Sequence, residues 1–215
     1  MRYLLLFLIL TIVVFGCSDK KKYHDVDEQG KVDTQPRGIA EILRFQKETN
    51  AKFKDPETSP LPDRYRKDFE GLNFFEPDTN YRVVAKLERT PDAVPFMMPT
   101  TTDRKSAEVV YGLAHFSLNG QRFRLEIYRS PELDSGVEDY LFLPFLDATN
   151  GNSTYGGGRY IDLSVPRGDS LIIDFNKAYN PYCVYNPKYS CPIVPRVNTL
   201  DTKIRAGMKT FQKEE

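Results

Sequence analysis

Apolar and polar residues alternate most clearly in the stretch EVVYGLAHFSLNGQRFRLEIYRS, residues 108 to 130. Two runs with this alternation, which is typical of half-buried strands, flank Asn119-Gly120. Asn-Gly between two such runs predicts a β-hairpin with a two-residue turn, and the turn fixes the register. On the core face the predicted pairs are Phe116 with Phe123, Ala114 with Leu125 and Gly112 with Ile127. On the other face they are Ser117 with Arg122, His115 with Arg124 and Leu113 with Glu126. This second face is either a solvated polar surface or a cationic binding surface.

Further stretches are rich in the β-branched and aromatic residues that favour strands. The predicted strands cover residues 81–90, 139–147, 159–165 and 170–175. Residues 95–100 are bounded by prolines, which predicts an edge strand or a loop.

Helical periodicity is found near both ends of the remaining chain. Ile39, Ile42 and Leu43 share one face of a predicted helix that starts at Pro36. Near the C-terminus, Leu200 and Ile204 form a weaker stripe, which Gly207 interrupts. We therefore predict a single mainly-β domain over residues 36–215, an antiparallel β-sandwich or barrel-like fold with flanking N- and C-terminal helices.

The composition narrows the functional classes. Hydrophobic residues make up 40% of the 215 residues, which is enough for a sizeable core. Thirty basic residues balance thirty acidic ones, so no long-range field would attract nucleic acid, and we expect no nucleic-acid partner.

The first residues resemble the signal sequence of a bacterial lipoprotein. Arg2 precedes an apolar run over residues 3–15, which is too short to span a bilayer. Val14-Phe15-Gly16-Cys17 then resembles a lipobox. We predict a lipoprotein signal peptide over 1–16, lipid attachment at Cys17 and a lipidated flexible tether over 17–35, with the body anchored on a membrane in the cell envelope and facing the periplasm or the exterior. An ordinary signal peptide and a short uncleaved anchor are the alternatives.

Lipid on Cys17 would leave Cys183 and Cys191 as a pair in an oxidising compartment, which predicts a disulfide. A metal site needs more ligands than these thiols with His24 and His115, and we predict no metal and no cofactor. A catalytic thiol with His115 as its base and two free buried thiols remain open alternatives.

Polar residues and glycines gather where the later strands end, which is where ligand sites on β scaffolds lie. Three successive glycines between two predicted strands would let a backbone approach a ligand closely. The candidate ligand-binding residues are Asp147, Tyr155, Gly156, Gly157, Gly158, Arg159, Asp162, Asp174, Asn176, Tyr179 and Asn180.

The two C-terminal blocks, FLDATNGNSTYGGGRYIDL and LIIDFNKAYNPYCVYNPKYSCPIVPRVNTLDTKIRAGMK, resemble the bacterial family called domain of unknown function 1684. SPL at 59–61, FEGLNFFEPD at 69–78 and YRVVA at 81–85 extend the resemblance, which covers about residues 38 to 211. Val197 and Met208 stand where the resemblance would place acidic residues. The resemblance implies one domain in which the Gly-rich turn and the Cys-bearing loop share a surface, and it implies no activity.

The sequence thus predicts a membrane-anchored lipoprotein that binds a small polar ligand or a cell-envelope component between the 147–162 turn and the 174–191 loop. A shallow groove of tyrosines would favour binding. The alternative is a cell-envelope hydrolase, although the common nucleophile motifs are absent. The hydrolase would use Asp147, Asp162 or Asp174 together with His115 or Arg159. The groove that favours binding would instead be lined by Tyr179, Tyr182, Tyr185 and Tyr189.

Overall fold

The computed structural model describes residues 37–131 and 139–211. These residues belong to one compact unit, Gln35–Glu215. The predicted signal peptide, Cys17 and nearly all of the predicted tether fall in a separate unit, Met1–Thr34, and lie outside the described residues. Within the described residues, no helix is long and apolar enough to cross a membrane.

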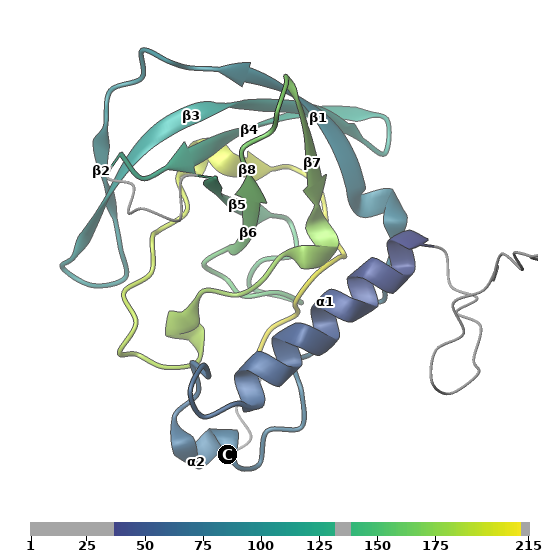
Figure 1. Ribbon diagram of the computed structural model, residues 1–215, viewed down its shortest axis with the longest axis vertical. Coiled ribbons are helices and arrows are strands. Elements are labelled where there is room, and N and C mark those ends of the chain that lie inside the picture. Colours follow the sequence, from purple (N-terminus) through teal and green to yellow (C-terminus); the bar gives the residue numbers. More distant parts are fainter. Residues whose placement is uncertain (1–36, 132–138, 212–215) are drawn as a thin grey trace, which may run out of the picture. The chain divides into compact units, whose positions relative to one another are not determined.

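The domain is built on one curled, mainly antiparallel sheet that forms a half-barrel, with strand order β6-β5-β4-β3-β1-β7 (Figure 1). Two short strands lie off this path: β2 pairs with β3, and β8 runs parallel to β5. The mainly-β prediction is confirmed, but residues 37–131 and 139–211 contain no second sheet that would make a sandwich. The strands are β1 Arg82–Arg89, β2 Phe96–Pro99, β3 Lys105–Leu118, β4 Gln121–Arg129, β5 Tyr140–Asp147, β6 Arg159–Ser164, β7 Ser170–Asp174 and β8 Thr199–Leu200.

The β3–β4 hairpin has the predicted register at all six pairs, from Gly112 with Ile127 to Ser117 with Arg122. Asn119 and Gly120 have φ values of 51° and 78°, the left-handed conformation that a two-residue hairpin turn requires. The sequence signal was sufficient here because both the turn and the alternation are local.

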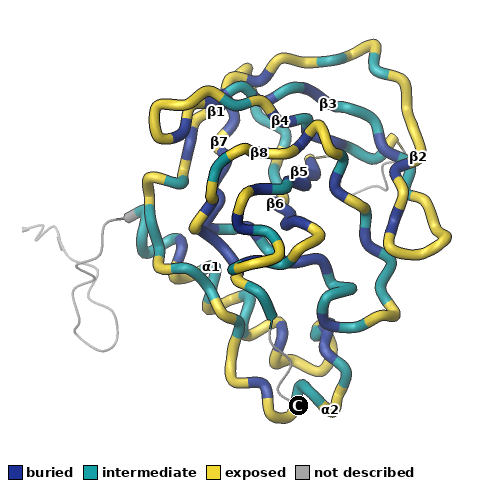
Figure 2. The backbone as a smooth tube through the Cα atoms, turned by 180° about the vertical axis from the view of Figure 1, so that it is seen from behind, coloured by how far each residue is buried: buried dark blue, intermediate teal, exposed yellow. Residues whose placement is uncertain are grey.

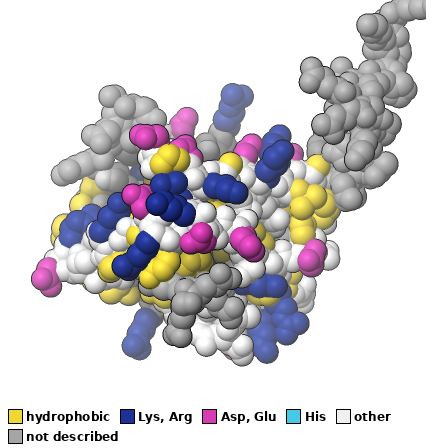
Figure 3. All heavy atoms as spheres, turned by 90° about the horizontal axis from the view of Figure 1, so that it is seen from below, with side chains coloured by type: hydrophobic (Ala, Val, Ile, Leu, Met, Phe, Trp, Pro, Cys, Tyr) yellow, Lys and Arg dark blue, Asp and Glu magenta, His cyan; other side chains and the backbone are white. Residues whose placement is uncertain are grey.

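The concave face of the sheet holds the main core, to which alternate residues of the strands other than β2 contribute. Ala85, Ala114, Leu125 and Phe145 are fully buried there. Figure 2 shows the buried residues concentrated in the strands and the exposed ones in the connecting loops. Figure 3 shows basic and acidic side chains interspersed over much of the face seen from below.

The helix predicted after Pro36 is present as α1, Arg37–Lys54. Ile42 is fully buried and Phe53 is 2% exposed, whereas Leu43, predicted to be on the same face, is 42% exposed. The inward face of α1 therefore runs from Ile42 to Phe53, with Phe45 and Thr49 half-buried between them. The other helical pieces are α2 Asp63–Arg66 and the 3-10 turns η1 Thr79–Tyr81, η2 Phe175–Lys177, η3 Tyr182–Val184 and η4 Arg196–Asn198.

The predicted C-terminal helix is wrong: β8 occupies Thr199–Leu200, and residues 201–211 contain no helix. Gly207 has φ 77°, and a Cβ there would lie 2.6 Å from the carbonyl oxygen of Ala178. Ile204, Ala206 and Met208 are buried along a segment that has no regular secondary structure. Their carbonyls bind a side chain, described below, rather than amides one helical turn later.

We expect Gly112→Ala to lower the free energy of unfolding by about 1–3 kcal/mol, because overpacking forces the backbone to shift. A Cβ at Gly112 would lie 2.6 Å from the carbonyl oxygen of Glu88 and 2.9 Å from Leu87 Cδ1. Gly168→Ala is the matched control, since a Cβ there meets nothing within 4 Å. Urea unfolding measures both, and equal stability of the two variants would contradict the prediction.

Candidate functional site

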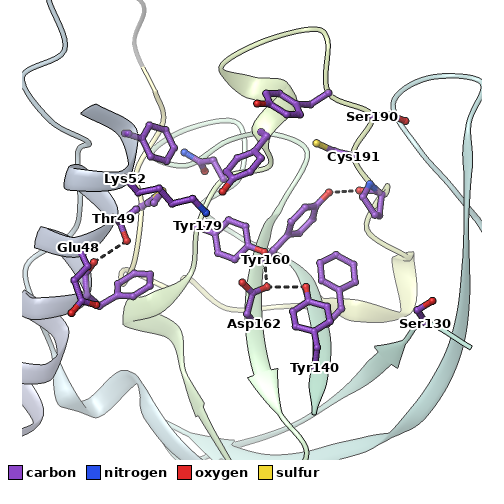
Figure 4. Close-up of a pocket in the computed structure, with 18 of the residues that line it drawn as sticks. Glu48, Thr49, Lys52, Ser130, Tyr140, Tyr160, Asp162, Tyr179, Ser190 and Cys191 are labelled. Atoms are coloured by element: carbon purple, nitrogen blue, oxygen red, sulfur yellow. Dashed lines mark hydrogen bonds between the residues drawn. The ribbon is translucent and has the colours of Figure 1, made fainter. Parts of the chain in front are cut away.

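A pocket of about 540 Å³ lies on the convex face of β5 and β6, against the C-terminal half of α1 and the loop over residues 179–192 (Figure 4). The strands contribute Tyr140, Phe142, Tyr160 and Asp162 to its wall. These four positions are separated by two residues along each strand, so they share one face, and the Cα atoms of Phe142 and Asp162 are cross-strand partners. The intervening residues of both strands face the core.

One face of α1 forms the opposite wall of the pocket. Its lining residues follow the spacing i, i+3, i+4, i+7 and i+8 that puts side chains on the same side of a helix. They are Phe45, Glu48, Thr49, Lys52 and Phe53. Sequence reasoning missed this face, although its signal was the continuation of the apolar stripe to Phe45 and Phe53.

The Asp162 carboxylate is held by two tyrosines. The hydroxyl groups of Tyr140 and Tyr179 both donate to Oδ1, at 2.9 and 2.6 Å. Burial, and then the negative charge of Asp162, raise the pKa of both phenols, so they remain protonated donors. Among the described residues, Oδ2 receives no such bond, and it stays available to a ligand or to water.

A second carboxyl group, that of Glu108 on β3, also lines the pocket. Glu108 is 7% exposed, and Ser106 Oγ donates to it at 2.8 Å. Burial raises the pKa of this carboxyl above its usual range, against the smaller effects of Ser106 and Arg104. Sequence reasoning missed Glu108, because a single acid at the start of a strand normally faces solvent.

Aromatic rings from the 179–192 loop close the pocket. The rings of Tyr182 and Tyr189 lie 5.3 Å apart, and the Lys52 ammonium lies 5.4 Å from the centre of the Tyr182 ring. Tyr179 meets Tyr160 edge-on at 5.8 Å. Tyr185, the fourth tyrosine of the predicted groove, does not line the pocket and instead packs in the core 4.8 Å from Phe53.

Cys191 lines the pocket beside Cys183, and both are free thiols in the structure. The backbone N–H of Cys183 donates to Sγ of Cys191 at 3.2 Å. Burial raises the pKa of the Cys191 thiol to about 11, so it is protonated at neutral pH. The disulfide stays a prediction.

Asp147 and Arg159 lie in the interior rather than in the pocket. Their side chains are fully buried and form an ion pair, with Arg159 Nη2 3.2 Å from Asp147 Oδ1. Arg159 also donates to the carbonyl oxygens of Ile204, Ala206 and Met208, at 2.9 Å for Ile204. Asp147 Oδ2 accepts from the Ile204 N–H at 2.8 Å. This pair therefore fixes the C-terminal segment against β5 and β6.

Asp174 and Asn176 have structural contacts as well. Asp174 Oδ1 accepts from the backbone N–H and the Nδ2 of Asn176, at 3.1 and 2.8 Å, which caps η2. The Asn176 amide exchanges two hydrogen bonds with the backbone of Asp78, at 3.0 and 2.8 Å. Both side chains join the end of β7 to the chain that enters β1.

The Gly-rich turn is packed against the protein instead of facing a ligand. A Cβ on Gly158, whose φ is 91°, would lie 2.7 Å from the carbonyl oxygen of Phe145. A Cβ on Gly157 would lie 2.5 Å from the Tyr155 ring. Of the eleven candidates from the sequence, Asp162, Tyr179 and Asn180 line the pocket, and Asp147, Tyr155, Gly156, Gly157, Gly158, Arg159, Asp174 and Asn176 do not.

The residues expected for a hydrolase are not assembled in one place. His115 Nε2 is 3.0 Å from Glu88 Oε2 on the β1–β3 surface, and His115 is not among the lining residues. Asp162 is in the pocket, while Asp147 and Arg159 are buried together. Within the described part of the chain, no group of three or more His, Cys, Asp or Glu side chains could hold a metal ion.

The family model described as "Protein of unknown function (DUF1684)" matches residues 67–209. Among solved structures, the chain is similar to an uncharacterized protein of Haloarcula marismortui determined by solution NMR, with 34% sequence identity and a TM-score of 0.63. The similarity covers 80% of this chain and 93% of that one. No curated protein matches the chain.

We expect Arg159→Met to lower the free energy of unfolding by about 3–5 kcal/mol, because it leaves the Asp147 carboxylate buried without its partner. Arg44→Met is the control: Arg44 forms a surface pair with Glu48 at 3.9 Å, and its loss should change stability by less than about 1 kcal/mol. Urea unfolding at pH 7 measures both. A loss below 1 kcal/mol for Arg159→Met would show that the pair does not hold the C-terminal segment.

Proposed function

Because this chain belongs to the DUF1684 family, for which no function is known, we propose one from the geometry of the pocket: the protein binds a small polar ligand there. The observation that carries the proposal is the Asp162 carboxylate, which two tyrosines orient at the pocket wall with Oδ2 left open. A few polar groups placed in a largely aromatic cavity are typical of small-molecule sites.

The size and the walls of the pocket support the same function. Its volume of about 540 Å³ lies inside the range of about 300–1,000 Å³ that is usual for ligand sites. Tyr140, Tyr160, Tyr179, Tyr182 and Tyr189 supply rings that are rigid and carry a polar end. Such rings bind a ligand with little loss of side-chain entropy.

Hydrolysis is the second candidate, and the observation that favours it is Glu108. A carboxyl group with a raised pKa in the same pocket as an oriented carboxylate is the combination that general acid catalysis requires. The thiol of Cys191 is a poor nucleophile candidate, since its pKa is also raised. Binding is preferred, because the acids and bases expected from the sequence lie apart.

The proposal places the protein on a membrane through lipid on Cys17, which lies outside the described residues. Its support is the lipobox-like Val14-Phe15-Gly16-Cys17 after a short apolar run. A protein held there would meet small ligands of the cell envelope, or envelope components that present a polar group.

We expect native mass spectrometry of the full-length chain, released from detergent micelles, to show a reproducible bound mass. Asp162→Asn should weaken the complex about ten- to a hundredfold, because a hydrogen bond to a charged group is lost. Asp92→Asn, which changes an exposed carboxylate that does not line the pocket, is the control. A bare chain in all three samples, or a bound mass that Asp162→Asn retains, would refute binding at this site.

We expect Cys17→Ser to abolish incorporation of radiolabelled palmitate, because the thiol that would carry the lipid is removed. The wild-type chain grown with the same label is the reference. An unlabelled wild-type chain, or label retained in Cys17→Ser, would contradict lipid attachment at Cys17.

A further inference from the structure

We infer that the ligand of this pocket is an organic cation, a protonated amine whose positive charge lies against the tyrosine rings beside Asp162. This inference rests on the proposed binding function and names its ligand class. Its support comes from the charges, the rings, one internal ammonium group and one unpaired acceptor.

The first support is the charge of the lining residues. Glu48, Glu108 and Asp162 face a single cationic lining residue, Lys52. Glu48 forms a surface pair with Arg44 at 3.9 Å, so the negative charge that Lys52 faces inside the pocket is that of Asp162, together with that of Glu108 when it is ionised. Arg104 is nearby, but its guanidinium donates to the carbonyl oxygen of Ser190 at 2.8 Å and is not part of the lining.

The second support is the set of rings around Asp162. The face of an aromatic ring carries negative charge density and attracts a cation by about 0.5–2 kcal/mol, most strongly where water is excluded. Tyr140 and Tyr179 hold Asp162 from two sides, and Tyr160 packs against Tyr179. Figure 4 shows these rings and the Asp162 carboxylate grouped at the centre of the pocket.

The third support is Lys52, which reaches from α1 toward Tyr179 in Figure 4. Its ammonium lies 5.4 Å from the centre of the Tyr182 ring, within the range of a cation–π contact. The side chain of Lys52 is long and exposed, so its ammonium group can move away from the Tyr182 ring. The protein's own ammonium therefore occupies the wall that a ligand cation would take, and the two would compete.

The fourth support is Asn180, a lining residue that is 2% exposed. Its Nδ2 donates to the carbonyl oxygen of Lys209 at 2.9 Å, which fixes the orientation of the amide. Among the described residues, its Oδ1 has no partner. An unpaired buried acceptor favours a ligand that brings N–H donors, since a donor that reached it would restore the missing bond.

The opposite hypothesis is an anionic ligand bound by Lys52 with the hydroxyl groups of Thr49 and Ser190. The two hypotheses differ in the sign of one effect. Removal of the Lys52 charge strengthens binding of a cation, because a competitor and a repulsive charge are lost, but it weakens binding of an anion.

The experiment is calorimetric titration of the full-length chain, in a non-ionic detergent at low salt, with three probes of similar size. These are benzylammonium, benzyl alcohol and phenylacetate. We expect benzylammonium to bind at least about tenfold more tightly than phenylacetate, Lys52→Met to tighten its binding about two- to tenfold, and Asp162→Asn to weaken it about tenfold. Lys47→Met, on an exposed position of the same helix outside the pocket, should change nothing.

The outcomes separate the two proposals. Tighter binding of phenylacetate, or weaker binding of the cation to Lys52→Met, would overturn the inference and leave a binding pocket of another specificity. No heat with any of the three probes would overturn the inference, and a bare chain in the native mass spectrum would then overturn the binding function as well. The side chains of Lys47, Lys52 and Asp162 are all exposed, so the three variants should fold.

Discussion

The buried ion pair between Arg159 and Asp147 is the interaction on which the rest of the domain depends. Two charges removed from water are tolerated only when hydrogen bonds satisfy them, and the C-terminal segment supplies these bonds together with Thr149, which donates to Asp147. The Met208 N–H in turn donates to the carbonyl oxygen of Ala178 at 2.8 Å, next to Tyr179. The backbone of Tyr179 then exchanges two hydrogen bonds of 2.9 Å with Tyr160, so the pocket wall is connected to the buried pair.

Strands β5 and β6 are covered on both faces, and this explains how one pair of strands can serve stability and binding together. Arg159 faces the core and Tyr160 faces the pocket, because successive side chains of a strand point to opposite sides. The core side holds the ion pair, which needs exclusion of water. The pocket side holds Asp162, which is exposed and therefore accessible to a ligand.

The local features of the fold were predictable from the sequence. The Asn119-Gly120 hairpin, its register and the helix α1 follow from turn chemistry and from periodicity within about twenty residues. The prediction of a C-terminal helix was wrong. Residues 204, 206 and 208 are buried where their backbone carbonyls accept hydrogen bonds from Arg159, and they do not form a helical stripe. For the site, Asp162, Tyr179 and Asn180 were identified, while Glu108 and the lining face of α1 were not.

By itself, the sequence determined the class of fold, the hairpin and the presence of polar residues at the strand ends, because each of these depends on neighbours in the chain. Only the tertiary structure decided which of those polar residues are buried contacts and which line a pocket. Asp147 and Asp162 are aspartates of the adjacent strands β5 and β6. The alternation of side chains along a strand separates the two faces of the sheet, but it does not show which face other segments of the chain will cover. Segments distant in sequence decided it: residues 204–208 cover the first carboxylate, whereas α1 and the tyrosine loop leave an open cavity above the second.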